Sequence, residues 1–83
     1  MSIRSVKYVN EVGKGPHLKV RTASEAEYEA YYNEFTEEVY LSTMSGEYVN
    51  NELLLLELED KHGDALFKLK QETERDNSRW ISL

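Results

Sequence analysis

The chain has no cysteine among its 83 residues, so its fold must be held by packing and hydrogen bonds without disulfides. A chain of this length has room for one modest hydrophobic core, and we expect a single domain over residues 1–83. The longest unbroken apolar run, residues 53–56, is far shorter than the roughly 18 residues that cross a bilayer. The first seven residues lack the apolar core of a signal peptide, which predicts a cytoplasmic protein.

Charge is distributed unevenly along the chain, and the formal net charge of -6 hides this. Residues 1–22 carry five basic side chains against one acidic side chain. Residues 23–60 carry acidic side chains and no lysine or arginine, and residues 61–83 are nearly balanced. The sequence therefore predicts a strongly acidic middle between a basic start and a balanced end.

Two strands are predicted at the N-terminus, over residues 3–9 and 17–22. The first is rich in β-branched and aromatic residues, and in the second apolar and charged residues alternate. The segment between them contains Gly13, Gly15 and Pro16, which suits a long hairpin connection.

A helix is predicted to begin at Ser24 and to end near Ser45 and Gly46. Ser24 and Glu27 match a capping box, which is typical of a helix start. At 100° per residue one side of this helix is apolar and largely aromatic, and it contains Tyr28, Tyr31, Tyr32, Phe35, Val39 and Ser42. Glutamates occupy the rest of the circumference, so the helix would bury its aromatic side and present an acidic side to water.

Residues after Asn51 favour strands in this interpretation, because their leucines scatter around a helical wheel and form no stripe. With a period of two, Leu54, Leu56 and Leu58 share one face, and residues 60–64 supply a turn. Further strands would follow at residues 67–69 and 80–83. The predicted fold class is α+β: a small antiparallel sheet in the order strand, strand, helix, strand, strand, strand, with one amphipathic helix packed on a face.

No motif in the chain predicts catalysis. Asp60, His62 and Asp64 alternate, which on a strand would put three metal-ligand types on one side. A polar turn is the better explanation, because aspartates are common in turns and no second cluster completes a coordination shell. The loop around Lys14 matches neither of the common phosphate-binding patterns. The basic N-terminal strands suit nucleic acid, but the acidic remainder repels a polyanion. We therefore expect no enzyme, no catalytic residue, no metal and no cofactor, and neither nucleic acid nor membrane as a partner.

The acidic middle is the strongest functional signal. Its glutamates stand at repelling spacings without basic neighbours, and such a face gains when a basic partner neutralises it, although simple solubility is the competing interpretation. Tyrosine beside exposed charge is a frequent interface anchor. The predicted partner-binding residues are Glu27, Glu29, Glu34, Glu37, Glu38, Tyr40, Glu47 and Tyr48.

In size, charge and layout the chain resembles the small acidic inhibitors that phages and mobile elements deploy against DNA enzymes, such as uracil-DNA glycosylase inhibitors. The resemblance implies a DNA-mimic-like protein that occupies or inhibits a basic surface of a partner protein, including one that normally holds nucleic acid. The alternative is a structural or assembly module that forms a homodimer through its C-terminal strands, with residues 80–83 at an exposed sheet edge.

Overall fold

The computed structural model describes residues 3–81 of the chain and has the predicted α+β class. Five strands form one antiparallel sheet in the order β1-β2-β3-β4-β5, and two helices follow. The elements are β1 (Ile3–Glu11), β2 (Gly15–Thr22), β3 (Glu27–Asn33), β4 (Glu38–Ser42), β5 (Tyr48–Val49), α1 (Glu52–Lys61) and α2 (Gly63–Ile81). The two predicted N-terminal strands are confirmed as β1 and β2.

The predicted helix over residues 24–45 is wrong, because this segment forms the hairpin of β3 and β4. Ser24, the expected helix cap, hydrogen bonds to the Thr22 hydroxyl at 2.9 Å in the turn before β3. Asn33 closes the hairpin by accepting from the backbone N–H of Phe35 at 2.9 Å. Phe35 was expected in the core, but it lies at the tip of the hairpin and is 90% exposed.

Tyr28, Ala30 and Tyr32 satisfy a period of two, and the neighbouring strand β2 decides between the helical and the strand period. In β3, alternate residues face the helices, where Tyr28 and Tyr32 pack around buried Ala30. Glu29 and Tyr31 point to the opposite face of the sheet. Pairing with β2 supplies backbone partners along β3, and β-branched and aromatic residues fit such a half-buried strand.

The predicted C-terminal meander is also wrong, since residues 52–81 form α1 and α2. The Asn51 side chain caps α1 by accepting from the backbone N–H of Leu54 at 3.1 Å. Leu54 and Leu58 are fully buried, while Leu53 and Leu56 are exposed. The leucines do lie on all sides of a helix, and α1 accommodates them by leaving two of them exposed to solvent.

A C-terminal strand at residues 80–83 is contradicted as far as the structure describes this segment, because α2 continues to Ile81. Ser82 and Leu83 lie outside the described residues. The alternative of a homodimer formed by pairing C-terminal strands therefore has no such strand in the described residues.

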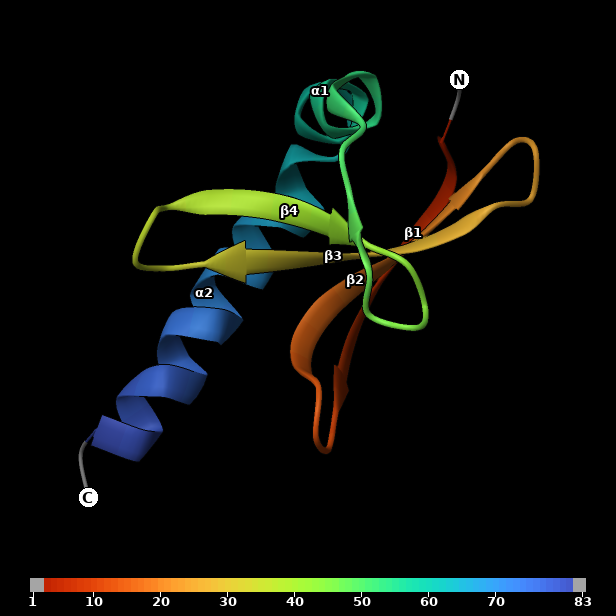
Figure 1. Cartoon of the computed structure of the whole chain (residues 1–83). Coiled ribbons are helices and arrows are strands. Elements are labelled where there is room, and N and C mark those ends of the chain that lie inside the picture. The colour runs from red at the N-terminus through yellow and green to blue at the C-terminus, as the bar shows by residue number, and fades with distance from the viewer. Residues whose placement is uncertain (1–2, 82–83) are drawn as a thin grey trace.

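The core lies between the sheet and the two helices. Leu18, Val20, Ala30 and Leu41 of the sheet meet Leu54, Leu58, Leu66 and Leu69 of the helices. Figure 1 shows α2 running obliquely across one side of the sheet, with α1 beside it near β4. Both helices thus cover the same face, and over residues 3–81 the opposite face carries no second layer. No helix in the described part of the chain is both long and apolar enough to cross a membrane.

Candidate functional site

The uncovered face of the sheet brings the basic hairpin of β1 and β2 against glutamates of β3. The register places Lys19 opposite Glu29 and Arg21 opposite Glu27. Ion pairs join Arg21 to Glu27, Lys14 to Glu29 at 2.9 Å and Lys19 to Glu11 at 3.2 Å, and Arg4 pairs with Glu25 at 3.3 Å. The positive charge predicted for the N-terminal strands is therefore largely neutralised within the molecule.

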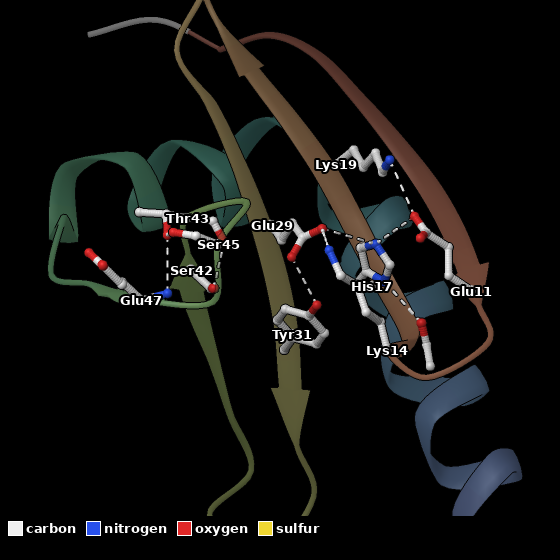
Figure 2. A network of polar contacts seen from close by, with 11 residues as sticks. Glu11, Lys14, His17, Lys19, Glu29, Tyr31, Ser42, Thr43, Ser45 and Glu47 are labelled. Atoms are coloured by element: carbon white, nitrogen blue, oxygen red, sulfur yellow. Dashed lines mark hydrogen bonds and ion pairs between the residues drawn. The ribbon is translucent and has the colours of Figure 1, made fainter.

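His17 lies in the middle of this network and is fully buried (Figure 2). Its Nδ1 lies 2.9 Å from the Gly15 carbonyl oxygen, and because a carbonyl only accepts, Nδ1 carries the hydrogen. Its Nε2 lies 3.5 Å from carboxylate oxygens of both Glu11 and Glu29. Sequence reasoning missed this group, because it depends on the pairing of three strands.

Glu29 is the most deeply buried acid of the network, with 1% of its surface exposed. Burial by itself would raise the pKa of Glu29. Hydrogen bonds from Lys14 and from the Tyr31 hydroxyl, together with the charges of Lys14 and His17, outweigh burial and lower this pKa below its usual value. Burial raises the pKa of the Tyr31 phenol, and its hydrogen bond to Glu29 raises it further. The hydrogen bond to Glu29 raises the pKa of Lys14.

These shifts predict how stability depends on pH. A carboxyl with a lowered folded-state pKa stabilises the fold above its unfolded pKa of about 4.3 and loses that contribution as pH falls through the folded value. Groups with raised pKa values, Tyr31 and Lys14, stabilise the fold below about pH 10 and lose their contribution as pH rises further. Urea unfolding measured from pH 3 to pH 11 should therefore give a plateau between these limits.

Glu29→Gln isolates the acid limb of this profile. The variant should be less stable at neutral pH and should decline less steeply below about pH 4.5, because the group that titrates there is gone. Glu34→Gln, a change at an acid without an ion pair in the described structure, is the matched control and should keep the slope of the wild type. An unchanged acid slope in Glu29→Gln would contradict the assignment.

The structure separates the predicted partner-binding residues into two groups. Glu27 and Glu29 lie on β3 and are engaged by Arg21 and Lys14, so they do not form part of a free acidic surface. The other six lie along the β4 side of the sheet, in the β3–β4 turn, on β4 and around β5: Glu34, Glu37, Glu38, Tyr40, Glu47 and Tyr48. Within the described residues none of these four glutamates makes an ion pair.

Tyr40 and Tyr48 are exposed on the uncovered face, near the edge of the sheet. Tyr31 connects Tyr40 to the buried network, because its ring stacks on His17 with centroids 5.2 Å apart and on Tyr40 with centroids 5.6 Å apart. The three stacked rings form a row that ends at Tyr40. Glu38 lies two residues before Tyr40 on the same face of β4. The described structure thus brings aromatic and unneutralised acidic groups to one edge.

A groove of about 590 Å³ runs between this edge and the helices, on the covered side of the sheet. We call it the β4 groove. Its apolar residues are Val39, Leu55, Leu66 and Phe67, and its acidic residues are Glu37 and Glu59. Glu38 borders the groove at the edge of β4, although alternation along the strand directs its side chain to the uncovered face. Lys70 also lines it, with its Nζ 5.8 Å from the centroid of the Tyr32 ring.

The sequence does not predict Leu55, Glu59 and Phe67 as site residues, because it favours strands for their segment. Two signals favoured helices there. Asn51 is a good helix cap with an acidic residue directly after it, and Leu54 and Leu58 are four residues apart.

The remaining candidate motifs are placed as follows. The loop around Lys14 directs that lysine to Glu29. Asp60, His62 and Asp64 lie at the junction of α1 and α2, not on a strand. Over residues 3–81 no three histidine, aspartate or glutamate side chains are arranged to hold a metal ion.

No protein-family model matches the chain, and neither the search of curated proteins nor that of solved structures found a similar protein.

Proposed function

We propose that this chain is a small protein-binding domain that docks on a basic surface of a partner protein through its β4 side. The surface consists of the acidic residues Glu34, Glu37, Glu38, Glu47 and Glu59 with the exposed rings of Tyr40 and Tyr48. One observation carries the proposal: the basic hairpin is largely neutralised by glutamates of β1, β3 and the turn before β3, whereas the glutamates of the β4 side have no ion pair in the described structure.

Unpaired charge of one sign favours association with the opposite sign and accelerates it. Exposed tyrosines add apolar contact area at small entropic loss and are frequent interface anchors. A basic surface that normally binds nucleic acid would lose that function when this domain covers it. Inhibition of a nucleic-acid-binding protein is therefore the specific form of the proposal.

An affinity pull-down from the native host, quantified by mass spectrometry at low and at moderate salt, tests the proposal. We expect the wild type to retain basic proteins at low salt and to release them as salt rises. Glu34→Gln/Glu37→Gln/Glu38→Gln should reduce their recovery by about tenfold, since each exposed charge pair contributes up to about 1 kcal/mol.

The matched control is Glu52→Gln/Asp60→Asn/Asp64→Asn, which changes the net charge equally at acids of the helices that also make no ion pair in the described structure and are not part of the proposed surface. It should retain the same proteins as the wild type. Equal recovery by the Glu34/Glu37/Glu38 variant and by this control would refute the proposal, because net charge alone would then explain the capture.

A further inference from the structure

The outer edge of β4 has backbone groups without a strand beside them. β5 pairs only with Leu41 and Ser42. The Thr43 N–H donates to the Glu47 carbonyl at 2.8 Å, so the N–H and C=O groups of Thr43 point away from β3. In a strand the backbone N–H and C=O groups of every second residue point to the same side. The N–H and C=O groups of Leu41 and Val39 therefore also point away from β3. The chain leaves the sheet after Val49 to begin α1, and no described residue pairs with Val39 on its outer side.

The opposite edge of the sheet is protected differently. β1 is nine residues long and carries Arg4 and Lys7, and charged side chains, lysine above all, hinder pairing with another strand. β4 has no lysine or arginine, and its one charged residue is Glu38. Of the two edges, β4 is therefore the one whose charge would attract a basic strand.

The β4 groove lies directly under this edge. The Val39 side chain points to the helices, and it lines the groove together with Leu55 and Phe67. In an added strand the residue opposite Val39 would point to the same side and enter the groove. The residues before and after it would lie on the uncovered face, opposite Glu38 and Tyr40.

From this geometry we infer that β4 captures an extended segment of its partner as an added β-strand over Glu38–Tyr40. The segment alternates, with an apolar side chain in the β4 groove and lysine or arginine on either side of it. One cation pairs with Glu38, and another lies over the ring of Tyr40, where the π face attracts it. At the groove the acidic residues Glu37 and Glu59 outnumber the basic residue Lys70, and this balance favours the same positive charge.

Charge selects this occupant over a second copy of the chain. Two β4 edges brought together would place Glu37 and Glu38 of one copy near the same acids of the other, and the molecules carry -6 each. The inference rests on the proposed function, because it names how the same acidic side would hold its basic partner.

The test uses synthetic peptides of about ten residues that alternate Lys or Arg with Val or Leu, with binding followed by fluorescence anisotropy. Two N-methylated versions carry methyl groups on alternate backbone nitrogens, which removes hydrogen bonds on one edge of the peptide and leaves its charge intact. We expect one methylated version to bind as the parent peptide does and the other to bind at least about tenfold more weakly. Equal binding by all three, or no binding by the parent peptide at millimolar concentration, would overturn the inference.

Variants of the protein supply the second arm. Val39→Pro removes the outward N–H without breaking the ladder to β3, because that N–H points away from β3. Val39→Ala is its control, since it shortens the side chain and keeps the N–H. Peptide affinity should fall about tenfold further in Val39→Pro than in Val39→Ala, with both variants checked for cooperative unfolding.

The two proposals fail separately. If Glu37→Gln/Glu38→Gln weakens peptide binding while Val39→Pro and both methylated peptides leave it unchanged, acidic docking stands and strand addition is wrong. If Glu37→Gln/Glu38→Gln has no effect on peptide binding or on capture of basic proteins, the proposed function fails as well.

Discussion

Leu58→Ala should lower the free energy of unfolding by about 2 to 5 kcal/mol, the largest effect we expect from a single substitution in this chain. Leu58 is fully buried in α1 and belongs to the core cluster with Leu54 and Leu69. Truncation leaves a cavity at the contact between helix and sheet. For a domain of this size such a loss lowers the melting temperature by about 10 °C or more, which thermal and urea unfolding both measure.

Leu56→Ala is the matched control, and it separates the two possible structures of this segment. Leu56 is 58% exposed on the helix, so its truncation should change stability by less than about 0.5 kcal/mol. On a strand, Leu56 and Leu58 would share one face and would respond alike. Similar losses in both variants would therefore contradict the helix and support the strand.

Glu29→Ala should destabilise the protein by about 2 to 4 kcal/mol at neutral pH, since it removes the acceptor of two hydrogen bonds and leaves buried polar groups without a partner. The Tyr31 hydroxyl loses its acceptor at 3.0 Å, and buried His17 loses one of its two nearby carboxylates. Urea unfolding at pH 7 measures this loss.

Glu27→Ala, two residues away on the same strand, controls for the removal of one glutamate. Its partner Arg21 is half-exposed, and exposed ion pairs contribute little to stability. We expect the Glu27 variant to unfold close to the wild type. Equal destabilisation of the two variants would mean that the His17 network has no special role in stability.

The hairpin of β3 and β4 shows why local patterns were insufficient. Residues 28–42 satisfy a helical period and a strand period, and the capping box at Ser24 favoured the helix. Only β2, which pairs with β3 over residues 27–30, distinguishes them. The same choice moved Tyr31 from the expected core to the uncovered face and Phe35 to the tip of the hairpin.

The prediction of strands in the leucine-rich segment was wrong for a different reason. The scatter of leucines around a helical wheel favours strands, but α1 buries Leu54 and Leu58 and leaves Leu53 and Leu56 exposed. Exposed leucines are ordinary on protein surfaces, so their scatter was weak grounds for rejecting a helix. Because of this error the sequence does not predict the helical side of the β4 groove, although it does predict Glu37 and Glu38, which line the groove on the strand side.

The sequence by itself determined the first two strands and the separation of a basic start from an acidic middle, because these follow from composition and local alternation. The predicted α+β class is right, although the predicted helix forms strands and the predicted C-terminal strands form helices. Only the tertiary structure decided which acids remain free. Strand register sets Lys19 opposite Glu29 and Arg21 opposite Glu27. The two residues of each pair are separated along the chain and become neighbours only when β2 and β3 pair. Charge neutralisation depends on distance in space, so the unpaired acids of the β4 side became visible only once the strands were paired.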